Sequence, residues 1–230
     1  MSVAQLSPVP ADCAWRAAVV GISGTGKSYA AKAFIRDLMK SKPKAHRIVV
    51  FDPCDEWSKK GRADADRGPL VDRVTFDALA EDPGRYLDVE PLSLAVVPSD
   101  DEDESAEQVL EFVQLVKATG DLVVVLDECG DYGFTKPGQA ALSLIARKGR
   151  HWRCPALFVA QRLTHLPPNC RSQLTELVTF LQTHPADVDA LEDITGDKGF
   201  AARVQKLSAE KRESLRWRGA VRGVEREEHA

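Results

Sequence analysis

The sequence predicts an α/β fold in which helices cover both faces of a mostly parallel central sheet. Short apolar runs rich in β-branched residues alternate along the chain with longer segments of helical periodicity, which is typical of βα units. The apolar runs are nearly all continuous, as expected of strands that are buried on both faces. The composition fits this class, because 43% of the 230 residues are hydrophobic and 29% are charged.

Six apolar runs are predicted to form the strands of this sheet. In chain order they are Ala17–Val20, Arg47–Phe51, Leu92–Val97, Leu122–Leu126, Ala156–Ala160 and Leu177–Leu181. Between them, apolar residues recur at helical spacing in three segments. The predicted helices are Lys27–Lys40, Ser105–Ala118 and Gln139–Arg147. No internal repeat interrupts this order, so we expect a single domain over residues 1–230, with its core at about 15–191 and a helical or strand extension over 192–230.

Polar composition predicts surface loops in two places. The segment Ser58–Leu70 is rich in Lys, Arg, Asp and Gly, and the run Ser99–Glu104 is almost wholly acidic. The acidic run stands just before a predicted helix, where carboxylates are favourable at the positive end of the helix dipole. A partner-binding element is the alternative interpretation of that run. The tail from Lys206 onward mixes basic and acidic residues, which favours a solvated face over a DNA-binding arm.

A phosphate-binding loop is the most specific signal in the chain. Residues Gly21–Ser28 read GISGTGKS and fit G-x-x-x-x-G-K-[ST] between a predicted strand and a predicted helix. The glycines allow the backbone to wrap a phosphate, and the helix adds its positive dipole end. Lys27 is then expected to reach the β- and γ-phosphates, and the Ser28 hydroxyl to ligate Mg²⁺. The candidate nucleotide-binding residues are Gly21, Ser23, Gly24, Thr25, Gly26, Lys27, Ser28 and Tyr29.

Two adjacent carboxylates follow the apolar run Leu122–Leu126. In an open α/β sheet the carboxyl ends of the strands carry the ligand site. Asp127 is a candidate magnesium ligand beside Ser28, and Glu128 is a candidate for polarising the water that attacks the γ-phosphate. A catalytic Glu at this position favours hydrolysis of ATP with Mg²⁺ over phosphate transfer to a metabolite. GTP is disfavoured, because no Asn/Thr-Lys-x-Asp follows a strand.

With these residues in view, the chain resembles the FtsK/HerA superfamily of P-loop ATPases, whose members are hexameric motors for DNA or peptides. The resemblance runs from about Trp15 to about Leu191, and its most specific segments are Ala146–Trp152, the strand that follows it, Gln161-Arg162 and Leu166–Arg171. It implies a RecA-like (ASCE) P-loop NTPase fold.

Two further site residues follow from that resemblance. Arg150 would be an arginine finger acting on the ATP of a neighbouring subunit, with Arg147 as the second candidate, and Gln161 would sense the γ-phosphate. The turn Phe51–Trp57 also resembles a HerA-type turn, although Cys54-Asp55 replaces its usual x-Gly. By that match Asp52 and Glu56 lie near the nucleotide or the subunit boundary, and a plain surface turn is the alternative.

The resemblance and the short chain together point to the genome-packaging ATPases of membrane-containing icosahedral DNA viruses. The expected partners are double-stranded DNA, held through non-specific phosphate contacts, the other subunits of a homo-oligomeric ring, expected to be a hexamer, and a capsid-vertex or membrane protein. The net charge of −4 requires any DNA contact to be local. The candidates are Lys59, Lys60 and Arg62 in the first loop and Lys136 in the loop after Glu128, with an ordinary solvated surface as the alternative for both.

Other functions remain open from the sequence. A secretion, filamentous-phage assembly or conjugation ATPase would use the same residues on another cargo. A small-molecule phosphotransferase, with Arg147, Arg150 and Arg153 as a lid, is a weaker alternative. The five scattered cysteines form no C-x-x-C pair, and the chain shows neither an export signal nor a transmembrane run, so we expect reduced thiols and a cytoplasmic or virion-associated location.

Overall fold

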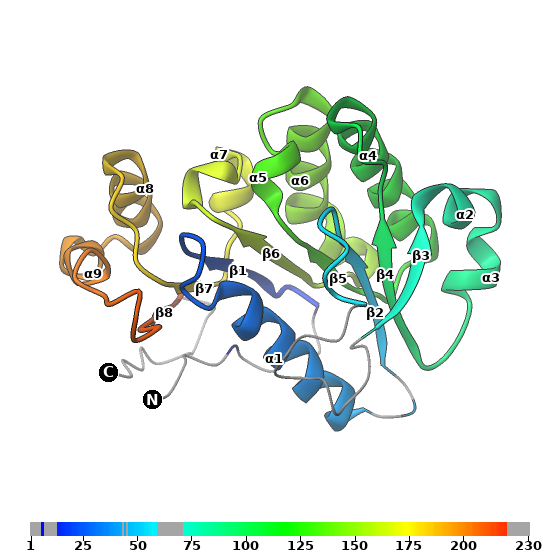
Figure 1. The fold of residues 1–230 in the computed structure, drawn as a ribbon, viewed down its shortest axis with the longest axis horizontal. Helices are drawn as coiled ribbons and strands as arrows, with labels where there is room; N and C mark the ends of the chain where they lie inside the picture. The colour runs from blue at the N-terminus through cyan, green and yellow to red at the C-terminus, as the bar shows by residue number, and fades with distance from the viewer. Residues whose placement is uncertain (1–5, 7–12, 43, 45, 59–70, 220–230) are drawn as a thin grey trace.

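The computed structural model describes residues 6, 13–42, 44, 46–58 and 71–219. Within this part of the chain, one sheet of eight strands runs in the order β3-β4-β2-β5-β6-β1-β7-β8 (Figure 1). The strands are β1 Arg16–Val20, β2 Arg47–Phe51, β3 Asp72–Thr75, β4 Leu92–Val97, β5 Val123–Leu126, β6 Ala156–Ala160, β7 Glu176–Thr179 and β8 Leu215–Arg218. Every neighbouring pair is parallel except β7 and β8, so the predicted mostly parallel sheet is confirmed.

Helices cover both faces of this sheet, as predicted. They are α1 Lys27–Ser41, α2 Phe76–Glu81, α3 Pro83–Leu87, α4 Glu102–Thr119, α5 Cys129–Tyr132, α6 Lys136–Lys148, α7 Pro168–Arg171, α8 Pro185–Thr195 and α9 Lys198–Val204, with 3₁₀ turns η2 Gly149–Trp152 and η3 Leu163–His165. In Figure 1, α1 lies on one face and α4, α5 and α6 lie on the other.

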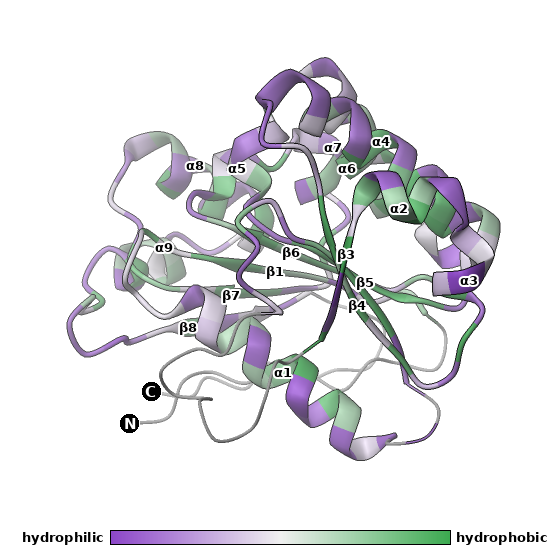
Figure 2. Ribbon diagram, turned by 45° about the vertical axis from the view of Figure 1, so that its right-hand side comes forward, coloured by the Kyte–Doolittle hydropathy of each residue, from purple (hydrophilic) through white to green (hydrophobic). Residues whose placement is uncertain are grey.

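The core divides between the two faces with the period of two that strands impose. In β1, Ala17 and Val19 pack with Phe34 and Ile35 of α1, whereas Ala18 belongs to the opposite core with the apolar side chains of α4 and α6. Figure 2 shows the result: the strands are apolar, and they lie between helices whose outer faces are polar. The strands are therefore buried on both sides, which is why they read as continuous apolar runs in the sequence.

Two predicted helix starts were three residues late. Helix α4 begins at Glu102 because the Asp101 side chain accepts a hydrogen bond from the Glu104 N–H, so the second half of the acidic run is helical and not a loop. Its carboxylates occupy the first helical turn, where the helix dipole favours them. Helix α6 likewise begins at Lys136, because Thr135 caps it by accepting from the Gly138 N–H.

Two polar edge strands, β3 and β8, were not predicted from the sequence. Only Val74 of β3 is buried, and every residue of β8 is half-buried, so neither strand has the apolar run that identified the others. Strand β8 pairs with β7, and the described part of the 192–230 extension is thus joined to the same sheet. A single domain with a core ending near residue 191 stays a prediction. Among the described residues, no helix is long and apolar enough to cross a membrane.

Candidate active site

Three of the four candidate catalytic residues, Lys27, Glu128 and Gln161, gather at the carboxyl edge of the sheet. Strands β2, β5, β6 and β1 are consecutive neighbours and parallel, so the segments that follow them emerge side by side. These segments begin with Asp52, Asp127, Gln161 and Gly21. The loop after β1 is therefore separated from the Asp127-Glu128 pair by a single strand, β6, whose end carries Gln161.

The loop Gly21–Gly26 has a backbone shape that other residues would disturb. A Cβ at position 21 would lie 2.6 Å from Thr25 Oγ1 and 2.7 Å from the Phe180 Cβ, so the close approach of these atoms requires glycine. Gly26 has a φ of 106°, in the region that side chains avoid. The Thr25 hydroxyl donates to the Ile22 carbonyl at 2.7 Å and closes the loop.

This loop fits a phosphate group. In the described part of the chain, the backbone N–H groups of Ser23, Gly24 and Gly26 donate to no carbonyl or side chain, and the fifteen-residue helix α1 begins directly after them. Free N–H donors at a helix N-terminus are a ready site for an anion. Ser28 is half-buried in the first turn of α1, and Tyr29 beside it is exposed.

Three predicted side chains meet in one contact group. Lys27 Nζ lies 2.6 Å from Glu128 Oε1, and only 8% and 14% of the two side chains are exposed. The other Glu128 oxygen accepts from Gln161 Nε2 at 3.4 Å. Glu128 takes a left-handed backbone conformation, φ 41°, which is costly for a residue with a side chain and is common at functional sites. The structure thus brings together one cation, one carboxylate and one amide from the segments that follow three different strands, β1, β5 and β6.

Asp127 is placed differently from Glu128. It is 3% exposed, its Oδ1 accepts from the Glu128 N–H at 2.9 Å, and its Oδ2 accepts from the Trp57 indole N–H at 2.5 Å. Burial raises the pKa of Asp127 to about 6, and hydrogen bonds from Trp57 and the Glu128 N–H partly oppose that rise. No cluster of three acidic, His or Cys side chains suited to a metal exists among the described residues. Mg²⁺ commonly binds through one or two protein groups, substrate phosphates and water, so the pair Ser28 and Asp127 remains a prediction.

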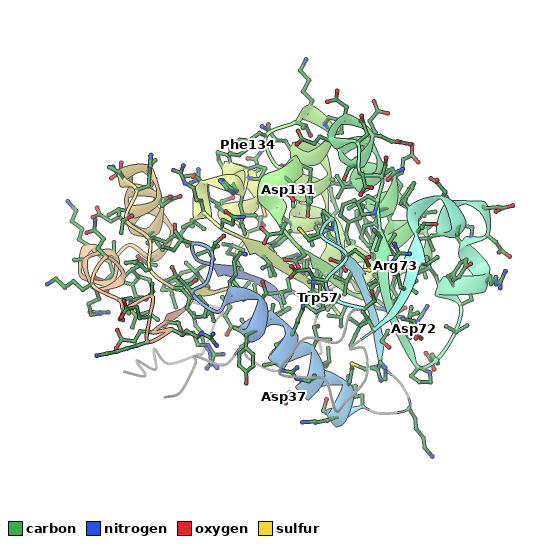
Figure 3. All side chains as sticks on the ribbon, in the orientation of Figure 1. Asp37, Trp57, Asp72, Arg73, Asp131 and Phe134 are labelled. Atoms are coloured by element: carbon green, nitrogen blue, oxygen red, sulfur yellow. The ribbon has the colours of Figure 1, made fainter. Side chains whose placement is uncertain are left out.

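Trp57 is a site residue that sequence reasoning did not single out by itself. Its side chain is fully buried, and the turn that carries it is closed by Asp52, whose two carboxylate oxygens accept from the N–H groups of Glu56 and Trp57 at 3.0 and 2.9 Å. Asp52 is itself fully buried, which raises its pKa above the ordinary value. Figure 3 places Trp57 in the middle of the molecule. The 52–57 turn is therefore not a plain surface turn, because it ends in a hydrogen bond to Asp127.

The predicted finger residues lie away from this group. Arg150 is in η2, between the end of α6 and the start of β6, which puts it at the amino edge of the sheet. It is exposed, and its guanidinium has no hydrogen bond or ion pair with any described residue. Arg147 is also exposed and donates to the Ser143 carbonyl of its own helix at 3.3 Å. Neither arginine can contact Lys27 or Glu128 of the same chain, as an action between subunits would require.

Two protein-family models match parts of this chain. The family model for the central domain of the helicase HerA matches residues 9–114, and a poxvirus A32 protein model matches residues 102–210. No curated protein is a significant sequence match.

Several solved structures share the fold over most of the chain. The genome packaging NTPase B204 from Sulfolobus turreted icosahedral virus 2, in complex with ATP-gammaS, has a TM-score of 0.61 at 18% identity, covering 90% of this chain and 93% of that one. VirB4 of Thermoanaerobacter pseudethanolicus has a TM-score of 0.61 at 13% identity, covering 89% and 87%. The cytoplasmic domain of the Thermomonospora curvata type VII secretion ATPase EccC has a TM-score of 0.55 at 14% identity, covering 89% and 24%. The predicted P-loop NTPase fold is confirmed, and so is the resemblance to FtsK/HerA-type ATPases.

Proposed function

We propose that this ATPase hydrolyses Mg²⁺-ATP to move double-stranded DNA, and that it is a packaging motor of a DNA virus. The observation that carries the hydrolysis is the contact group of Lys27, Glu128 and Gln161 beside the phosphate loop. The packaging role is supported by the likeness to B204 over nine-tenths of both chains and by the match to the poxvirus A32 model.

The residues divide the chemistry of hydrolysis between them. Entry of the triphosphate replaces the Lys27–Glu128 ion pair, so that Lys27 binds the β- and γ-phosphates and Glu128 is released to orient a water. Mg²⁺, which Ser28 and Asp127 would hold with its water shell, supplies charge neutralisation at the phosphates when it is bound. The indole N–H of Trp57 fixes the orientation of the Asp127 carboxylate.

Gln161 is placed to pass the state of the γ-phosphate to the rest of the chain. Its side chain contacts Glu128, while its backbone carbonyl accepts from Gln182 Nε2 at 3.0 Å. The next residue, Arg162, forms an ion pair with the buried Asp187 of α8 at 2.9 Å. A change in the Glu128 contact on hydrolysis would therefore reach α8 through a short run of hydrogen bonds.

The ring, the finger and the DNA contact complete the proposal. Arg150 from one subunit would complete the site of its neighbour in a homo-oligomeric ring of about six subunits. Lys136 is exposed at the start of α6. Phe134 near it is 65% exposed (Figure 3), so this loop offers DNA both a cation and an aromatic ring. It follows Glu128 through the single turn of α5. The other candidates, Lys59, Lys60 and Arg62, lie outside the described residues.

The test is the rate of ATP hydrolysis with and without long duplex DNA, over a range of salt concentrations. We expect DNA to stimulate the rate at low salt and the stimulation to fall as salt rises, because phosphate contacts release counterions. The variant Lys136→Ala should reduce the stimulation and leave the basal rate unchanged. A rate that is indifferent to DNA at every salt concentration would contradict the DNA-motor proposal while leaving the ATPase intact.

A secretion or conjugation ATPase is the second candidate, favoured by the likeness to VirB4 and EccC. Binding to inner-membrane proteins without stimulation by DNA would support it. The phosphotransferase alternative requires Arg147, Arg150 and Arg153 to cover the phosphate loop. These arginines lie at the opposite edge of the sheet from Lys27, so this alternative is disfavoured.

A further inference from the structure

The turn before β8 lies beside the phosphate loop. Strand β8 is antiparallel to β7, with Leu215 opposite Thr179, so the chain enters β8 from the carboxyl edge of the sheet. The turn at residues 208–213 has its own hydrogen bonds: the Glu213 N–H donates to the Ser208 carbonyl at 3.1 Å, and the Ser208 N–H donates to Glu213 Oε2 at 2.9 Å. The turn is thus held by hydrogen bonds of its own, and it lies at the carboxyl edge of the sheet, where Lys27 and Glu128 meet.

Arg212 is the residue of this turn that contacts the loop. A Cβ built on Gly26 would lie 3.5 Å from Arg212 Cδ and 3.7 Å from Arg212 Cβ, so the aliphatic stem of Arg212 packs against Gly26. The backbone of Arg212 is left-handed, with φ 54°, and this conformation is unfavourable for a residue that has a side chain. The guanidinium is one bond beyond Cδ and makes no hydrogen bond or ion pair with any described residue.

The charge around the loop shows what this guanidinium can do. Lys27 is already paired with Glu128, and Asp127, Asp52 and Asp131 add further carboxylates near the site. A triphosphate therefore approaches a site whose loop lysine is neutralised by a carboxylate. Arg212 brings to the same loop a cation that no carboxylate of the described chain holds.

We propose that Arg212 binds the phosphate chain of the nucleotide held by the loop of its own subunit. This inference rests on the proposed function, since it requires that Gly21–Ser28 binds a nucleotide. A guanidinium suits the role because it makes charge-assisted, forked hydrogen bonds to phosphate oxygens and keeps its charge at any physiological pH. The C-terminal strand β8 then does more than extend the sheet, because it positions a second cation at the loop.

Equilibrium binding of Mg²⁺-ADP and Mg²⁺-ATPγS, measured by calorimetry, tests this assignment. We expect Arg212→Ala and Arg212→Gln to lower the affinity for both nucleotides about tenfold, and Arg212→Lys to lower it less. The loss of affinity should shrink as the salt concentration rises. Arg212→Gln keeps part of the stem and removes only the charge. Lys211→Ala is the matched control, because Lys211 is the exposed neighbouring cation of the same turn and should leave both affinities unchanged.

Different results overturn different claims. If wild type binds nucleotide and both neutral Arg212 variants bind equally well, the role of Arg212 is wrong and the proposed function stands. If Lys211→Ala weakens binding as much as Arg212→Ala, the effect is one of general charge and the specific contact is wrong. If wild type binds no nucleotide, the proposed function fails, and this inference fails with it. Equal thermal unfolding midpoints would show that the variants are folded.

Discussion

The two edges of the sheet differ in whether their candidate site residues contact one another within one chain. At the carboxyl edge, Lys27, Glu128 and Gln161 are in contact within one chain. At the amino edge, the turn of Arg150 is held firmly, since Arg16 Nε donates to the Ala146 carbonyl at 3.1 Å and a Cβ on Gly149 would lie 2.9 Å from Arg16 Nη2. The Arg150 guanidinium itself is exposed and makes no hydrogen bond or ion pair with any described residue.

This difference is the one that the proposed ring requires, because each chain holds a group of three candidate catalytic residues at one edge and, among the described residues, an arginine without a hydrogen-bond or ion-pair partner at the other. Strand β1 joins the two, because Arg16 at its start anchors the Arg150 turn and Gly21 after its end begins the phosphate loop. A ring in which the amino edge of one subunit faces the carboxyl edge of the next would complete every site.

The largest effect is expected at the amino edge. Arg150→Ala should lower ATP turnover about a thousandfold, because a guanidinium that neutralises the transferring phosphoryl group is worth that much or more. The affinity of the variant for Mg²⁺-ATPγS should change little in the monomer. Turnover is measured for mixtures of wild type and variant, in which activity should fall more than in proportion to the variant fraction.

The control for that experiment is Arg153→Ala. Arg153 is an exposed arginine of the same region whose partner is Asp121, and we expect its loss to leave turnover within about twofold of wild type, because an exposed ion pair contributes little. A strictly proportional fall in the Arg150→Ala mixtures would remove the action between subunits.

At the carboxyl edge, Glu128→Gln should lower turnover about a hundredfold and leave or strengthen nucleotide binding. The amide cannot polarise a water as a carboxylate does, and it no longer holds Lys27 in an ion pair. Single-turnover hydrolysis together with nucleotide retention measures both effects. Equal loss of binding and turnover would show that Glu128 is structural.

Trp57→Phe should have a smaller effect than Glu128→Gln, about tenfold instead of about a hundredfold, and the effect should be on the Mg²⁺ requirement. Phenylalanine fills only part of the space of the buried indole, and the Asp127 oxygen loses its indole donor, which alone costs about 1–3 kcal/mol of unfolding free energy. If Asp127 positions Mg²⁺, the Mg²⁺ concentration for half-maximal turnover should rise about tenfold.

The comparison of edges supplies the control for this variant. Trp15→Phe removes an indole donor from the buried Glu176 at the amino edge, at 2.9 Å, and should lower stability similarly without changing the Mg²⁺ requirement. A rise in that requirement for both variants would assign the effect to lost stability alone.

The smallest effect concerns pH and Asp52. Burial raises the folded-state pKa of Asp52 above its unfolded value, so its ionised form costs stability at neutral pH, and that cost disappears as pH falls through the raised pKa toward the unfolded one. Relative to Asp52→Asn, wild type should therefore gain unfolding free energy as pH falls from 7 to about 4. Urea denaturation in the presence of a chelator measures the slope, and parallel curves for the two proteins would contradict the shift.

Sequence alone predicted what depends on local pattern. The apolar strands β1, β2, β4, β5 and β6 were placed within one residue, since their burial on both faces leaves continuous runs. The loop Gly21–Ser28 and the Asp127-Glu128 pair were found because a strand followed by fixed residue types is a local signal, and parallel topology then brought Lys27 and Glu128 together.

Long-range contacts were not predictable in the same way. The bond between Trp57 and Asp127 joins residues 70 positions apart, and nothing near Trp57 in the sequence specifies its partner. Arg212 stood in a tail of mixed charge that favoured a solvated face, and its contact with Gly26 depends on the pairing of a polar strand that the sequence did not reveal.

The most direct test of the account is a structure of the protein with Mg²⁺-ATPγS bound. We predict that the γ-phosphate lies between Lys27 and Glu128, with Lys27 Nζ moved from its 2.6 Å contact with Glu128 to the phosphate oxygens. A nucleotide bound elsewhere, with the Lys27–Glu128 pair intact, would contradict the account.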